Sequence, residues 1–539
     1  MNIKQLRETV DKLFSTRLSF MMLQQEIGEH FFPQRADFTV RRTLGTEYAS
    51  QLMTSYPVLV RRDLGDQIGQ MLRPTATPWF KVIPKNNEKT DNEGKRWLEM
   101  VTMKMRRAMY TKPAQFNKAT KQADHDFASF GNSVMTCRPN RVVDNLLYRN
   151  WHLRDVAWRE NAEGVIDLVA RKWKPTAYDL KGLFGDKAGD KVDRLIQQNR
   201  HFDTVSCYHI VVESNLYDDD SRGRPWFSIF YNSEHEMIME SVPVWVNEYI
   251  ISRWETLSGS SYAFSPATIT ALPDARMLQA MAYTILEAGE KATNPPMVAT
   301  EDVIRSDVAI YAGGITWADK DYDERLGDAL RPLTQDLRGL PFGQDMIMDS
   351  RMLLAQAFFL NKLALPVRDA EMTAYEVGQR VQEYIRGALP IFEPMETECN
   401  GEQCQKTFDT LFRLGVFGSP RDIPPQLFNE GIDFEYESPL HDAIEEQKGQ
   451  KFLESKALIA EALDLDRGAA FVMDARTALR DALTSVGVSP SWLHSEDDVE
   501  AMVANEARAE QERADMEQML QGSEVAKNIG ATGKDLQLA

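Results

Sequence analysis

The feature that most constrains this chain is a helical run near its middle that has no polar face. The predicted helix covers 342–365, and from Met352 to Leu365 apolar side chains fall on nearly every side of it. Such a helix is stable in water only when it is enclosed on several sides. The run is shorter than the roughly eighteen apolar residues that a membrane span requires. The sequence therefore predicts a helix that other protein, or further copies of the same chain, must surround.

A first helix is predicted before it, over 272–296. Its apolar residues recur with the helical period, at Leu278, Met281, Ala282, Ile285 and Leu286. The run stops at Asn294-Pro295-Pro296, because proline lacks an N–H and forces the preceding residue toward extended geometry. A helix of about twenty-two residues spans roughly 33 Å.

The segments between and after these two helices also have recognisable patterns. The excursion between them, 297–341, is polar and contains several acids. After the second helix, the segment 366–372 interrupts the chain at Pro366, and Thr373-Ala-Tyr-Glu376 begins a third helix with a capping box. The predicted unit is helix, excursion, helix, tight loop, helix.

Length and composition indicate a soluble protein. At 539 residues the chain is long enough for more than one domain, and its hydrophobic (43%) and charged (27%) fractions are those of globular proteins. The first residues show no apolar signal-peptide core. The four cysteines lack C-x2-C spacing, so we expect reduced thiols and a cytosolic product.

The net charge of −19 has two interpretations. An acidic surface keeps a large protein soluble. It also repels DNA, so the charge does not favour a protein that binds DNA through a general excess of basic residues. Two basic pairs, Arg41-Arg42 and Arg61-Arg62, interrupt the acidity. They could contact DNA or carboxylates of a neighbouring subunit, and the second is favoured because no aromatic residues alternate with them.

Periodicity and turn signals predict an α+β chain that is mainly α. Further helices are predicted within 1–75, the last at Tyr48–Leu72, and at Glu93–Met109, Phe116–Phe130, 176–185, 191–198 and 408–415, and from Ala443 to Leu520. Strands are predicted at Trp79–Pro84, 133–137, 165–173, 205–212, 226–231, 237–242 and 249–254.

Several short motifs, in this order, resemble the portal (head-to-tail connector) proteins of short-tailed, podovirus-type bacteriophages. The central ones are Asn294-Pro295-Pro296-Met297-Val298-Ala299, Ala312-Gly313-Gly314-Ile315 and Met372-Thr373-Ala374-Tyr375-Glu376-Val377. The others are Leu64-Gly65-Asp66-Gln67-Ile68, Pro78-Trp79-Phe80, Phe130-Gly131-Asn132, Arg253-Trp254, Ser265-Pro266-Ala267 and Tyr436-Glu437-Ser438-Pro439-Leu440. Together they cover roughly residues 20 to 500. The family often has Tyr-Gly before its Ser-Pro-Ala, where this chain has Tyr262-Ala263-Phe264.

The resemblance implies the portal fold, assembled as a ring. In that arrangement 1–271 would form N-terminal helices and an α+β wing, and 272–296 the first stem helix. The segment 297–341 would be the clip, 342–365 the second stem helix and 366–372 the channel loop. Wing helices would occupy 373–418, a helical crown 419–521 and a disordered tail 522–539.

The resemblance also suggests two groups of site residues. The channel-loop group, placed against DNA, is Lys362, Pro366, Val367, Arg368 and Asp369. Arg368 could contact one phosphate non-specifically in each copy, or it could pair with Asp369 of a neighbouring loop. The clip group, expected to meet the packaging motor or the tail, is Trp317, Asp319, Asp321, Asp323 and Glu324. These acids lack the glycine and the distal Glu of a calcium loop, so we expect no metal there.

Signals for catalysis or cofactors are weak. Gly530-Ala-Thr-Gly533-Lys534 is too short for a phosphate-binding loop, and His235-Glu236 lacks a second histidine at metalloprotease spacing. His201, Cys207 and His209 would share a side of one strand only if that strand began by His201. We therefore expect no metal, no cofactor and no enzyme activity.

The function implied by the resemblance is a twelve-copy ring at one capsid vertex. It would carry double-stranded DNA during packaging and ejection. It would also bind the terminase large subunit, the major capsid and scaffolding proteins, the tail adaptor or nozzle, and internal core proteins. Such a protein resides in the virion, is made in the host cytoplasm and has no membrane partner. Two alternatives remain open: another structural virion protein, such as a tail adaptor or scaffold, and a nucleic-acid enzyme.

Overall fold

The computed structural model describes most of the first 300 residues and parts of the remainder. The described residues are 1–41, 43, 52–75, 78–85, 92–140, 145–299, 317, 325, 330–332, 340–363, 387, 395–428 and 431–436, with short stretches between 455 and 513. Two compact units are present. The first comprises Met1–Lys81, Val101–Ser419 and Phe434–Leu440, and the second comprises Val82–Met100, Pro420–Asp433 and His441–Ala539.

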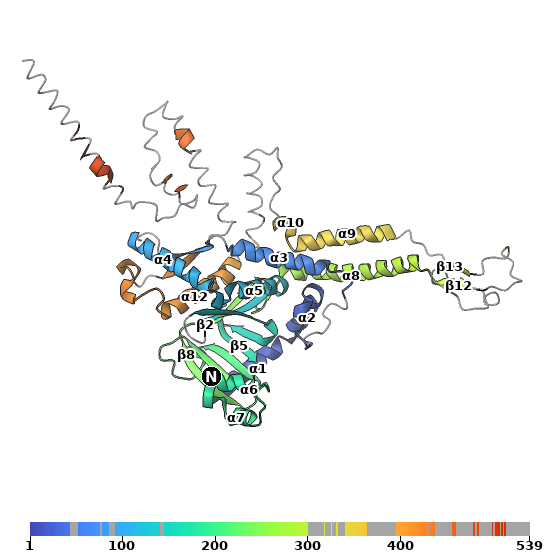
Figure 1. Cartoon of the computed structure of the whole chain (residues 1–539), viewed down its shortest axis with the longest axis horizontal. Helices are drawn as coiled ribbons and strands as arrows, with labels where there is room; N and C mark the ends of the chain where they lie inside the picture. The colour runs from blue at the N-terminus through green and yellow to red at the C-terminus, as the bar shows by residue number, and fades with distance from the viewer. Residues whose placement is uncertain are drawn as a thin grey trace, which may run out of the picture. The chain divides into compact units, whose positions relative to one another are not determined.

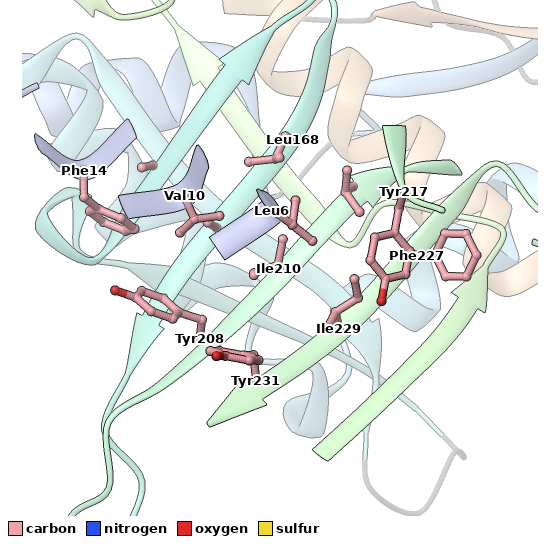
Figure 2. Close-up of a cluster of buried hydrophobic side chains, with 13 residues drawn as sticks. Leu6, Val10, Phe14, Leu168, Tyr208, Ile210, Tyr217, Phe227, Ile229 and Tyr231 are labelled. Atoms are coloured by element: carbon pink, nitrogen blue, oxygen red, sulfur yellow. The ribbon is translucent and has the colours of Figure 1, made fainter. Parts of the chain in front are cut away.

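The first unit contains a five-stranded antiparallel sheet whose strands follow sequence order. They are β4 (Val156–Glu160), β5 (Ile166–Trp173), β6 (Cys207–Glu213), β7 (Trp226–Asn232) and β8 (Met237–Val244). Helix α1 (Ile3–Thr16) begins with a capping box between Asn2 and Gln5 and places Leu6, Val10 and Phe14 on the sheet. In Figure 2 Leu6 and Val10 lie beside Ile210, and Phe14 lies beside Tyr208, with 6.2 Å between the ring centroids.

The opposite face of this sheet is covered by an insertion between β5 and β6. It consists of α6 (Ala177–Phe184) and α7 (Asp190–Gln197). Each face of the sheet has its own hydrophobic core, because successive side chains of β6 point to opposite faces. Cys207 packs under the insertion, while Tyr208 and Ile210 face α1.

A three-stranded sheet, in the order β3-β2-β9, forms the second β-structure of this unit. Its strands are β2 (Asn132–Pro139), β3 (Leu146–Trp151) and β9 (Tyr249–Arg253). Helix α5 (Phe116–Phe130) leads into β2 through Gly131, whose φ of 69° is left-handed. Helices α2 (Leu18–Phe31) and α3 (Tyr56–Leu72) pack on α5.

Two helices of the same unit, α8 and α9, form an antiparallel hairpin (Figure 1). Helix α8 covers Pro266–Thr293 and α9 covers Leu340–Ala357, followed by the short α10 (Leu360–Leu363). Beyond α8, β12 (Met297–Ala299) pairs antiparallel with β13 (Leu330–Pro332). A π-helical turn at Glu396–Gly401 leads into α12 (Glu402–Arg413).

The described residues of the second unit are few. They include most of the first half of α4 (Asn92–Met109) and two short 3-10 turns. Within this unit Lys85 N donates to Gly431 O at 2.8 Å. Strands β1 (Phe80–Pro84) and β14 (Ile432–Tyr436) form a two-stranded sheet.

Most of the predicted elements that fall on described residues are confirmed, as is the α+β class. Helix α5 has the predicted bounds, and Gly415, with φ of 71°, follows the end of α12. The seven predicted strands correspond to β1, β2 and β5–β9. The third helix at 373–388 and almost all of 443–520 lie outside the described residues, as does the tail 522–539.

Four predictions of helix bounds are wrong. The helix predicted at 408–415 begins six residues earlier, at Glu402, directly after the π-helical turn. The helix predicted at Tyr48–Leu72 begins only at Tyr56, because Pro57 occupies its first turn, where a missing N–H costs nothing. The helix predicted from 272 begins six residues earlier, since Ser265 caps it and Pro266 is its first residue. The helix predicted over 342–365 is broken after Ala357, where Phe359 adopts a φ of 58°.

Candidate functional site: a helical hairpin and its root

The inner face of the hairpin is tightly packed. On α9 Ser350 and Leu354 are buried four positions apart, and Phe358, just past the end of the helix, continues their stripe and packs on Phe31 of α2 with 5.4 Å between ring centroids. On α8 Leu278 is fully buried. A β-carbon at Gly343 would lie 3.0 Å from Ile285 Cδ1, so the helices approach closely where a side chain is missing. Helices α8 and α9 therefore pack closely on each other, and at the root the buried stripe continues onto α2.

The outer faces of the hairpin expose large apolar side chains. Those of α9 are Phe342 (68% exposed), Met346, Met348, Met352 and Leu353, and those of α8 beyond Ile269 in its first turn are Met277, Tyr283 and Leu286. We call these eight residues the apolar flank. Water-exposed groups of this kind usually mark a protein interface.

The flank residues of α9 fall into two rows. With about 100° of rotation per residue, Phe342, Met346 and Leu353 lie roughly 100° to one side of the buried stripe. Met348 and Met352 lie about 140° to its other side. We call these the first row and the second row. The helix therefore offers apolar surface in two directions, neither of which is covered by α8.

The root of α8 is fixed to the end of α5 by buried hydroxyl groups. Ser265 Oγ donates to Ala128 O at 2.8 Å, and Thr268 Oγ1 donates to Ser129 O at 2.8 Å. The same Ser265 oxygen accepts from Thr268 N at 3.4 Å, which caps the helix. One serine therefore both starts α8 and attaches it to α5.

Motifs that are far apart in the sequence meet at this root. Asn132 Nδ2 donates to Ala263 O at 2.7 Å, and Ala263 N donates to Asn132 Oδ1 at 3.0 Å. Trp254 N donates to Gly131 O at 2.9 Å, and the Trp254 ring stacks on Phe127 with 5.2 Å between centroids. The motifs Phe130-Gly131-Asn132, Arg253-Trp254 and Ser265-Pro266-Ala267 therefore form one junction.

The π-helical turn is held to the same region by charged pairs. Arg253 donates to both carboxylate oxygens of Glu398, at 3.1 and 2.9 Å, in a bidentate pair. The buried Arg73 donates to Asn400 Oδ1 at 2.8 Å and forms an ion pair with the buried Asp124 of α5. Burial opposes the charge of Arg73, but the Asp124 carboxylate outweighs it and raises the pKa of Arg73.

The basic side chains of α8 and α9 are all engaged. Arg276 Nε donates to Glu26 at 2.7 Å, Lys291 pairs with Glu287 at 2.6 Å, and Arg351 lies 5.4 Å from the centre of the Tyr56 ring. Glu290, Asp345 and Asp349 are exposed. The described surface of the hairpin is therefore apolar and acidic.

Most of the site residues predicted from sequence lie outside the described part of the chain. This applies to Pro366, Val367, Arg368 and Asp369 of the channel-loop group and to Asp319, Asp321, Asp323 and Glu324 of the clip group. Lys362 belongs to α10, and Trp317 is 68% exposed. These groups remain predictions. Sequence reasoning missed the two rows, although a helical projection from Leu354 would have separated them.

The histidine-cysteine group considered from sequence is dispersed. Strand β6 begins at Cys207, so His201 lies before it. His209 is fully buried and contacts the Tyr249 hydroxyl at 2.6 Å through Nδ1 and the Ser228 hydroxyl at 3.0 Å through Nε2. Burial, with Arg171 and Arg138 nearby, lowers its pKa well below the usual value. Within the described residues, no group of three His, Cys, Asp or Glu side chains is arranged to hold a metal.

Comparisons with known proteins agree with the motifs. The model of the family described as "Bacteriophage head to tail connecting protein" matches residues 3–493. The portal protein of Salmonella phage epsilon15 is 22% identical over 477 residues, covering 85% of this chain and 82% of that protein. Among the described helices, none is long and apolar enough to cross a membrane. The chain therefore belongs to the bacteriophage head-to-tail connecting family, as a structural portal protein that joins the virion head to the tail.

Proposed function

We propose that twelve copies of this chain form a ring at one capsid vertex, with the α8–α9 hairpins surrounding a channel for double-stranded DNA. The observation that carries the proposal is the apolar flank. Since the flank residues stay exposed although α8 and α9 pack closely on each other, they need a partner outside the hairpin. Full burial of one large apolar side chain contributes roughly 1.5–3 kcal/mol, so five on α9 alone supply a substantial driving force.

The two rows support a ring over a simple dimer. A two-fold dimer uses one patch on both partners, whereas a ring uses two different patches, one on each side of every subunit. The first and second rows point in different directions from the buried stripe. Each row can thus contact a different neighbour.

The charges of the hairpin support a channel. Exposed Glu290, Asp345 and Asp349 repel phosphates, while Arg276, Lys291 and Arg351 have partners within the chain. A duplex beside such a wall meets few attractive contacts and slides without being held. Occasional contacts would come from the channel-loop group around Arg368.

Within this ring we assign the wing to 1–271 and 373–418, the stem to 272–296 and 342–365, and the crown to 419–521. The clip, 297–341, would dock the terminase large subunit during packaging and tail proteins afterwards. The paired strands β12 and β13 support this assignment, because they join the two ends of the segment next to the stem. Capsid, scaffolding and internal core proteins would contact the remaining surfaces.

Separate disruption of the two rows tests the ring. One variant carries Phe342→Ser, Met346→Ser and Leu353→Ser, and the other carries Met348→Ser and Met352→Ser. Each variant should remain folded but fail to form rings, and an equal mixture should yield dimers only, because one intact first row can pair with one intact second row. A Phe202→Ser control, at a side chain that is 83% exposed elsewhere, should assemble normally. Rings from either row variant would contradict the proposal.

A further inference from the structure

One segment of the first unit departs sharply from the acidic character of the chain. About one residue in seven of the whole sequence is acidic, 81 of 539. Residues 100–123 contain none, yet they contain six basic side chains. We call these six the basic strip: Lys104, Arg106, Arg107, Lys112, Lys118 and Lys121. They lie on the second half of α4, the turn that follows it, and the first turns of α5.

A surface hollow of about 480 Å³ lies at the α5 end of the strip. Lys121 lines the hollow, and so does Thr75, whose carbonyl oxygen accepts from Arg106 Nη2 at 3.1 Å. Tyr110 of the connecting turn is a further lining residue. Arg106 of α4 and Lys121 of α5 therefore both adjoin this hollow, although they are 15 positions apart in the sequence.

Half of the strip has no counter-charge. The side chains of Arg107, Lys112 and Lys118 are exposed and form no hydrogen bond or ion pair with any residue that the structure describes. Lys104 donates to Val416 O at 3.0 Å, and a carbonyl does not neutralise it. Lys121, at the edge of the strip, forms an ion pair with Asp66, with 3.1 Å between Nζ and Oδ1.

The beginning of α5 adds to the positive potential. Its first turn contains no acidic residue, and no side chain caps its free N–H groups. The helix dipole places partial positive charge there, and Lys118 lies in the same turn. The buried acids of α5, Asp124 and Asp126, are paired with Arg73 and Arg35, so they do not offset the strip.

We propose that the basic strip binds the phosphate backbone of duplex DNA that lies against the outside of the protein. Lysine and arginine bind phosphates without regard to sequence and gain affinity by releasing counterions. Four of the six residues are lysine, which is depleted at protein–protein interfaces, so DNA fits the strip better than a second copy does. The contact is separate from any duplex that passes through a channel.

Binding to closed circular duplex DNA tests this contact, because such DNA has no end that can enter a channel. The strip variant carries Arg107→Gln, Lys112→Gln and Lys118→Gln. Its control carries Lys187→Gln, Lys191→Gln and Arg194→Gln, which removes equal charge from exposed positions of the α6–α7 insertion, where acids alternate with bases. Filter binding over a range of salt concentrations gives the affinity and the number of phosphates contacted.

We expect the full chain to bind closed circles and the strip variant to bind them roughly tenfold more weakly or worse. The slope of log affinity against log salt should fall by about 0.9 for each lost contact, while the control keeps the wild-type slope. Absence of binding by the wild type, or an equal loss in both variants, would overturn the proposal. So would a strip variant that loses self-assembly but keeps its DNA affinity, since a second copy would then be the partner.

Discussion

The backbone of Gly131 lies directly against the backbone of Ser265, and no room for a side chain is left between them. A β-carbon at Gly131 would overlap Ser265 N and the carbonyl group of Phe264. Ser265 caps α8, so the close approach fixes where the hairpin leaves the rest of the unit. The position and direction of the proposed stem therefore depend on a glycine far from it in sequence.

Replacement of Gly131 by alanine should destabilise the first unit more than the same change at Gly415. Both glycines follow helices and have similar left-handed φ values, 69° and 71°, so each alanine costs about 1–2 kcal/mol of backbone strain. Only Gly131 also has backbone in the space of the new methyl group, which adds roughly 1–3 kcal/mol or more. Urea unfolding of the two variants measures the difference, and equal losses would contradict the steric explanation.

Stability should fall in acid partly through Asp37. Burial alone would raise the pKa of this carboxyl, but contacts with His152 and Arg154 lower it to about 2. The unfolded carboxyl titrates near pH 4, so the stabilisation is complete above that pH and is lost as the pH falls toward 2. Asp37→Asn should therefore lose less stability than the wild type between pH 5 and pH 3. An exposed Asp190→Asn control should follow the wild type, and identical slopes for all three proteins would refute the assignment.

Arg368→Ala should leave ring assembly intact and alter DNA packaging or retention. The expectation follows from the proposed assignment of Arg368 to the channel loop, where it would supply one phosphate contact per copy. Genome content of virions carrying the variant is the measurement. Lys12→Ala, an exposed charge on α1, is the matched control. Normal genome content in Arg368→Ala virions would refute the loop assignment.

Replacement of the clip residues 300–329 by a short glycine-serine linker should abolish terminase or tail docking while leaving a soluble oligomer. The replacement retains β12 and β13, so the ends of α8 and α9 remain joined as in the intact chain. Co-sedimentation with the terminase large subunit measures docking. Undiminished docking would show that the clip lies elsewhere.

Local patterns in the sequence predicted most elements of the described fold. Helix α5 was predicted with correct bounds because its apolar period and Gly131 are both local signals. Strands β3 and β4 were missed, since turn clusters do not separate them clearly and β3 includes the charged Arg149. The start of α3 was predicted too early, because hydrophobic periodicity alone does not show that the helix begins next to Ser55 and Pro57.

The site was harder to predict because it depends on contacts between distant segments. The motifs around Gly131, Arg253 and Ser265 were recognised one by one, but nothing in their order shows that they touch. The break at Phe359 was also hidden, because a left-handed phenylalanine has no sequence signal. The apolar helix of α9, by contrast, did indicate a need for neighbours, and its rows follow once Leu354 is known to face inward.

The central claim is that this chain is stable in its working form as a closed ring of copies around an opening. Mass measurement of the purified full-length protein, with negative-stain images of the same sample, tests it most directly. The account predicts particles of twelve subunits, each 61.5 kDa, with a central hole wide enough for a duplex. A purified protein that consists of folded single chains, with no central opening, would contradict it.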